Sequence, residues 1–128
     1  MIINDTKWNR RPTCVVYEWL TEKQIEEIKE FIIRTINVLR NNTKGKIWFS
    51  AYDLIGKENR DWKNTPLEYL YKAHLAHNAQ QAYSSAAKDI GLFLLDILRK
   101  DTKNKYEMSY SIRTRNGLKI GIRTYCLY

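Results

Sequence analysis

Cysteine is scarce in this sequence, and no hydrophobic run is long. Only Cys14 and Cys126 occur among the 128 residues, and neither belongs to a CxxC motif or a Cys/His cluster. A disulfide-rich scaffold is therefore excluded, and we expect two reduced thiols, with a single bridge between them as the alternative. No apolar stretch approaches the ~20 residues that a membrane span needs, and residues 1–12 lack the apolar core of a secretory signal. We therefore expect no membrane partner and a cytoplasmic location.

Proline and glycine are also few, with two and five residues, and they fall where helices end or the chain turns. No internal repeat, low-complexity tract or linker separates one part of the chain from another. A chain of 128 residues can bury a core without metal or disulfide support. We expect a single domain over 1–128, with an N-terminal arm or edge strand over 1–20, a mainly helical part over 21–100 and a β-hairpin over 105–127.

Acidic residues are outnumbered, because 14 Asp and Glu stand against 22 Lys and Arg and give a net charge of +8. That balance excludes an acidic mimic of DNA and favours partners that carry negative charge. Half of the surplus lies in the last fifth of the chain, where Asp101 and Glu107 are outnumbered by Lys103, Lys105, Arg113, Arg115, Lys119 and Arg123. This clustering predicts a phosphate-contacting surface, with a well-solvated terminal hairpin as the alternative.

The first half of the chain contains clear helix and strand signals. Thr21 and Gln24 form a capping-box pattern, and the apolar stripe that follows predicts a helix over about 22–40. The apolar and aromatic residues 46–49 predict a short strand. Ser50 and Asp53 form a further capping pair, which predicts a short helix over about 51–55.

The middle of the chain has a strong helix start at Thr65, since Pro66 suits the first helical position and Glu68 completes a capping box. We expect this helix to break near residues 77–78, where Asn78 would cap a last helix over about 79–100; one unbroken helix to residue 100 is the alternative. The segment 90–98 is apolar almost all round and must be buried on most sides.

Asn116-Gly117 lies between two β-prone runs, which is a strong hairpin signal. A two-residue turn would pair Arg115 with Leu118 and Arg113 with Ile120. One face of the hairpin would then join the core, through Tyr106, Met108, Tyr110, Ile112, Tyr125 and Leu127. Residues 13–19 are expected to add an edge strand.

The resulting fold class is α+β, with an N-terminal helix, a short strand, a helical middle and a C-terminal β-hairpin. This order resembles the winged-helix superfamily, in which a helix-turn-helix pair follows a short strand and a hairpin wing closes a three-stranded sheet. The resemblance implies that residues 79–100 hold the recognition helix and residues 105–127 form the wing. The chain departs from the pattern by inserting residues 57–64 and an extra helix.

The resemblance directs attention to the polar half of the last helix and to the hairpin. A helix-turn-helix centred on Gly91 is rejected, because the residues after it are too apolar to enter a groove of DNA. Gln80, Gln81 and Ser84 are instead expected to face base edges, and Lys88 to meet phosphate. The basic residues proposed for the wing are Arg113, Arg115 and Lys119, with Arg123 further along. The alternative is that residues 80–88 form an ordinary solvated face.

Metal, cofactor and catalytic signals are weak. His74 and His77 are three residues apart on an expected helix, but no third metal ligand matches them, and His74 falls on the apolar stripe. Asp53, Glu58 and Asp61 form an acidic group near a tryptophan, although capping already accounts for Asp53. We therefore expect no metal site, no cofactor and no enzymatic activity.

The leading hypothesis is a small basic protein that binds nucleic acid without catalysis, through a winged-helix-like surface. Tight binding would then require a homodimer or a second basic surface, such as Lys7, Arg10 and Arg11. The alternative is a phage-type inhibitor that docks on a bacterial nucleic-acid-processing or defence complex, for example an anti-CRISPR, in a bacterial or phage-infected host cell. A small hydrolase or nuclease using Asp53, Glu58, Asp61 and His74 is the third hypothesis.

Overall fold

The computed structural model of the chain describes residues 1–5, 15–42, 44–54 and 62–127, apart from the side chains of residues 113, 115 and 120. It is a mixed α+β fold, as the sequence predicts. Its elements in chain order are α1 (Val16–Trp19), α2 (Glu22–Asn41), β1 (Trp48–Phe49), α3 (Ala51–Leu54), α4 (Glu68–Ala76), α5 (Ala82–Lys100), β2 (Tyr106–Arg115) and β3 (Leu118–Leu127).

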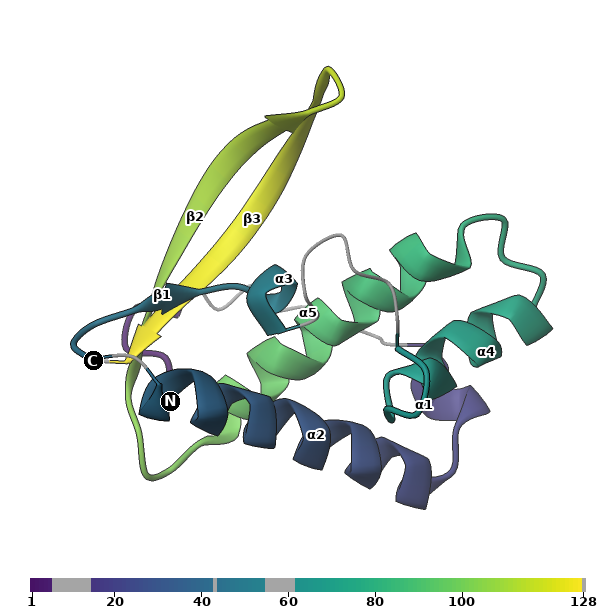
Figure 1. Ribbon diagram of the computed structural model, residues 1–128, viewed down its shortest axis with the longest axis horizontal. Helices are drawn as coiled ribbons and strands as arrows, with labels where there is room; N and C mark the ends of the chain where they lie inside the picture. Colours follow the sequence, from purple (N-terminus) through teal and green to yellow (C-terminus); the bar gives the residue numbers. More distant parts are fainter. Residues whose placement is uncertain (6–14, 43, 55–61, 128) are drawn as a thin grey trace.

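Helix α2 follows the sequence prediction closely. The Thr21 side chain accepts a hydrogen bond from the Gln24 backbone amide, and the Gln24 side chain accepts one from the Thr21 amide, so the capping box is present. The helix buries Ile28, Ile32 and Ile36 along one stripe. Figure 1 shows α2 on the side of α5 away from the hairpin.

Helix α5 starts at Ala82, three residues later than expected, because Asn78 ends α4 instead of capping α5. Asn78 has a φ of 58°, and the amide of Ala79 donates to the carbonyl of His74 at 3.0 Å while that of Asn78 donates to Leu75 at 3.1 Å. This is the Schellman arrangement, in which a left-handed residue satisfies the last carbonyls of a helix. The expected break between the two helices is confirmed, and the expected cap is wrong.

The start of α4 also differs from the expectation. The Thr65 hydroxyl donates to the Trp62 carbonyl at 2.8 Å, so it does not cap the helix. Tight i→i+3 backbone bonds follow, from Glu68 to Thr65 and from Tyr69 to Pro66, and regular α-helix begins only at Glu68. The residues of the capping-box pattern are thus used in a turn that precedes the helix.

The expected edge strand over 13–19 is wrong where the structure describes it, since Val16–Trp19 is a helical turn, α1. Val16 is fully buried, and Trp19 stacks on His77 with ring centroids 3.7 Å apart. Three-dimensional packing against α4 therefore overrides the β-prone local sequence. Cys14 lies outside the described residues, while Cys126 is a buried free thiol.

The three strands form an antiparallel sheet in the order β1-β3-β2. The register pairs Arg115 with Leu118 and Arg113 with Ile120, as predicted from the two-residue turn. Asn116 and Gly117 both have positive φ, 51° and 77°, which the tight turn requires. The Asp53 carboxylate accepts hydrogen bonds from the amide and the hydroxyl of Ser50 just before α3, so the two residues pair as predicted. The Ser50 hydroxyl does not accept from the Asp53 amide, which donates to the Ser50 carbonyl instead.

The core is built around α5, which packs against α2, α3 and α4 and shares one buried cluster with the base of the sheet. The apolar half of α5 is buried, as expected, and Tyr106 and Tyr125 pack against Phe49 of β1. Each such fully buried side chain contributes roughly 1.5–3 kcal/mol. Only the base of the hairpin, around Tyr106 and Tyr125, belongs to the core. The outer part of β2 and β3 extends beyond the helices (Figure 1). Tyr110 and Ile112, expected in the core, are each 64% exposed.

Candidate nucleic-acid interface

A groove of about 940 Å³ separates the N-terminal half of α5 from the β2–β3 hairpin. Figure 1 shows the two elements diverging from their meeting point at the sheet, with α3 between them. Three parts of the chain line the groove. The first comprises Ser50, Ala51 and Tyr52 at α3, together with Trp62. The second is Gln81 and the α5 residues Tyr83, Ser84, Ala87, Lys88, Gly91, Leu92 and Leu94. The third is the hairpin, through Tyr110, Asn116, Leu118, Gly121, Ile122, Arg123 and Tyr125.

The α5 wall of the groove carries two polar side chains among mostly apolar ones. Ser84 and Lys88 are four residues apart and therefore share one face of the helix, while Ala86 and Ile90 are buried on another. Gln81 adds a polar group just before the helix begins. The hairpin supplies Arg123, which is exposed. None of the described residues that line the groove is Asp or Glu. The two cations of this lining give the groove a positive potential.

Aromatic rings form the second chemical feature of the groove. Tyr83 stacks on Tyr71 at a centroid distance of 4.0 Å and meets the edge of Trp62 at 5.4 Å, so its position is fixed from two sides. Tyr52 lines the groove from α3 and Tyr110 lines it from β2. Tyr125 of β3 is buried, and this burial raises the pKa of its hydroxyl. Such rings offer flat apolar faces beside the polar groups of α5.

The structure brings together some of the residues predicted from the sequence. Gln81, Ser84 and Lys88 share the groove with Arg123. Gln80 is exposed in the turn before α5 and Lys119 is exposed on β3, and neither lines the groove.

The side chains of Arg113 and Arg115 lie outside the described residues. Their backbone positions pair with 120 and 118, whereas Lys119 pairs with Thr114. Side chains of neighbouring positions on a strand alternate between its two faces. The register therefore separates Lys119 from the two arginine positions.

The sequence pattern does not reveal that Tyr83 and Tyr110 line the groove. Alternation with Tyr106 and Met108 along the strand predicts a core position for Tyr110, and helical spacing predicts a packing role for Tyr83. The available signal is length: a ten-residue strand extends further than the core that one helix can cover.

The two histidines have structural partners. Nε2 of His74 lies 2.5 Å from Oδ2 of Asp89, and both residues are buried, so the pair joins α4 to α5. His77 is exposed and stacks on Trp19. Within the described part of the chain, no three His, Cys, Asp or Glu side chains gather as a metal site would require. The Asp53 carboxylate accepts hydrogen bonds from Ser50, and Glu58 and Asp61 lie outside the described residues.

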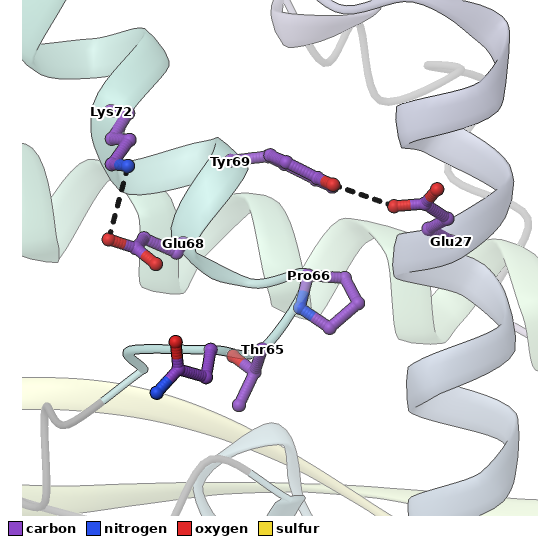
Figure 2. Close-up of a pocket in the computed structure, with 7 residues that line it drawn as sticks. Glu27, Thr65, Pro66, Glu68, Tyr69 and Lys72 are labelled. Carbon is purple, nitrogen blue, oxygen red and sulfur yellow. Dashed lines mark hydrogen bonds and ion pairs between the residues drawn. The ribbon is translucent and has the colours of Figure 1, made fainter.

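A smaller hollow of about 330 Å³ lies between α2 and the start of α4 (Figure 2). The Tyr69 hydroxyl donates to Glu27 at 2.7 Å, and this hydrogen bond raises the pKa of the tyrosine. Lys72 pairs with Glu68 at 3.3 Å. The charged groups drawn in Figure 2 thus satisfy one another on the surface, and this hollow offers no group poised for chemistry.

Comparisons with models of protein families, with curated proteins and with solved structures found no match for this chain. Among the described residues, no helix combines the length and the apolar character that crossing a membrane requires.

Proposed function

We propose that this protein binds nucleic acid through the groove between α5 and the hairpin, and that it does so without catalysis. The observation that supports this most is the lining, in which Lys88 and Arg123 face the same recess as Gln81 and Ser84, with no carboxylate among the described lining residues. Cations meet phosphates, and amide and hydroxyl groups hydrogen-bond base edges. The net charge of +8 adds a favourable long-range field.

The resemblance of the chain's element order to the winged-helix superfamily favours the same proposal. In this arrangement the polar half of α5 faces the bases. Lys119 shares the face of the hairpin that carries Arg123, so it would add a further phosphate contact along the projecting strand. Few contacts of this kind give weak, salt-sensitive binding, so a homodimer or a second basic surface would raise the affinity.

The test is a mobility-shift or anisotropy titration across a salt series. Lys88→Ala with Arg123→Ala should weaken binding and lower the slope of log K against log salt by about 0.7–0.9 for each phosphate that the variant no longer neutralises. A charge-matched control, Lys23→Ala with Lys103→Ala, removes two exposed lysines that do not line the groove. The proposal fails if the protein ignores both DNA and RNA at low salt, or if both pairs weaken binding equally.

A second candidate function is docking on a protein complex that processes or defends against nucleic acid. It is favoured by the exposed apolar side chains on the hairpin, since Tyr110, Ile112 and Leu118 are 64%, 64% and 69% exposed. Exposed aromatic and aliphatic groups of this kind anchor protein interfaces. Capture of a bacterial complex that survives nuclease treatment, and that is lost in Ile112→Ser with Leu118→Ser, would support it over the first.

A further inference from the structure

Tyr110 is an exposed ring that is held in a defined place. It pairs with Arg123 across the hairpin, and its side chain lies diagonally over Gly121 on the other strand. A Cβ built at Gly121 would overlap the Tyr110 hydroxyl and lie 2.6 Å from Cζ. The ring therefore occupies space that only glycine leaves open, while 64% of the residue remains accessible at the groove wall.

The shape of the groove sets which form of nucleic acid it suits. A recognition helix that reads a duplex must protrude into the major groove. Here Gln81, Ser84 and Lys88 lie instead in a recess that the hairpin and α3 border. A recess of about 940 Å³ has room for a few nucleotides, so it suits a flexible single strand better than a recognition helix would.

The donors of the groove also suit bases whose edges are free. Gln81 and Asn116 offer amide groups that can both donate and accept hydrogen bonds. The indole Nε1 of Trp62 is buried and has no hydrogen-bond partner among the described residues, although Trp62 itself lines the groove. Paired bases in a duplex already use their Watson–Crick edges, whereas unpaired bases can meet such groups and stack on rings.

We propose that the groove binds single-stranded nucleic acid, with an unpaired base stacked on Tyr110 and its flanking phosphates on Lys88 and Arg123. This inference rests on the proposed nucleic-acid binding and specifies its substrate. Stacking on an aromatic ring is tolerant of sequence, because every base has a flat face. DNA and RNA share this chemistry, so both are included in the test.

The experiment compares fluorescence anisotropy of oligothymidylate, oligouridylate and a blunt DNA duplex, each of about 12 nucleotides or base pairs, with the full chain. Either single strand should bind at least about fivefold more tightly than the duplex. Tyr110→Ala should weaken single-strand binding by about fivefold or more, and Tyr110→Phe should not. Gly121→Ala should imitate Tyr110→Ala, because the added methyl group displaces the ring without removing it.

The matched control is Ile112→Ala, which removes an equally exposed side chain from the same face of β2. It should leave single-strand binding within about twofold of wild type, because Ile112 offers no ring to stack on. Equal or tighter duplex binding, or Tyr110→Ala binding like wild type, would overturn the single-strand inference and leave nucleic-acid binding intact. Absence of binding to all three probes at low salt would overturn both proposals.

Discussion

At the scale of single residues, the buried pair of His74 and Asp89 links α4 to α5, the helix that forms one wall of the groove. Both side chains are removed from solvent, and their atoms approach to 2.5 Å. When one member of a buried ion pair or hydrogen-bonded pair is removed, the protein loses more stability than when both are replaced by apolar residues. The reason is that the remaining polar group stays removed from water. His74→Leu should therefore lower the free energy of unfolding by about 3 kcal/mol in urea denaturation.

The double variant His74→Leu with Asp89→Leu should recover part of that loss. Asp96→Ala is the control on the same helix, since its partner Lys100 is exposed, and its effect should stay below about 1 kcal/mol. A single-variant effect no larger than that of the control would show that solvent reaches Asp89.

Tyr106 gives a prediction for alkaline pH. Burial and the hydrogen bond that its hydroxyl donates to Asp101 raise the pKa of Tyr106 to about 12, from 10.0. The unfolded chain therefore loses this proton first, and the stability that the group contributes is complete below pH 10 and lost as pH rises towards 12. Urea denaturation should show the advantage of wild type over Tyr106→Phe shrinking across that range. A constant difference would contradict the buried hydroxyl.

At the scale of elements, Asn78 fixes the junction between α4 and α5. Its left-handed φ of 58° costs a residue with a Cβ roughly 1–2 kcal/mol, which asparagine partly offsets and glycine avoids. Asn78→Ala should lower the free energy of unfolding by about 1 kcal/mol, while Asn78→Gly should match or exceed wild type. Thermal unfolding of the three proteins measures this. Equal loss in both variants would point to the Asn78 side chain instead of its backbone.

The elements that could be predicted from the sequence are those whose signals are local. The capping box at Thr21 and the turn at Asn116-Gly117 act through hydrogen bonds and φ angles within a few residues. The start of α2 and the register of the hairpin could therefore be predicted correctly from the sequence. The starts of α4 and α5 were predicted wrongly, because Thr65 and Asn78 are residue types that suit a turn as well as a helix cap. Only packing decides between such uses.

The candidate groove also has features that the sequence predicts and features that only the three-dimensional structure reveals. The shared face of Ser84 and Lys88 follows from helical periodicity and could be predicted. The partner of His74 could not, because Asp89 lies fifteen residues away on another helix. Nor could the exposure of Tyr110, which depends on how far the hairpin extends past the helices.

At the scale of the whole molecule, the outer hairpin is separable from the core. Along two antiparallel strands, hydrogen-bonded and non-hydrogen-bonded residue pairs alternate. The pair Ser109 and Thr124 lies six positions from the pair Arg115 and Leu118, so both pairs are of the same kind. Deleting residues 110–115 and 118–123 would therefore let Asn116-Gly117 turn directly between Ser109 and Thr124 in register. Tyr106 and Tyr125, which are buried at the base, remain in place.

This shortened chain should keep most of its stability and lose nucleic-acid binding. The described side chains that it removes are mostly exposed and none of them belongs to the buried core, so the core contacts stay in place. Because the deletion also removes four positive charges, the matched control replaces Lys23, Lys44, Lys103 and Lys105 with alanine in the full-length chain. If binding depends on the groove, the deletion abolishes nucleic-acid binding. The control only weakens binding, because it lowers the net positive charge that attracts nucleic acid over long range. Equal binding by the two variants would show that net charge alone attracts the nucleic acid, and unfolding of the shortened chain would show that the outer strands support the core.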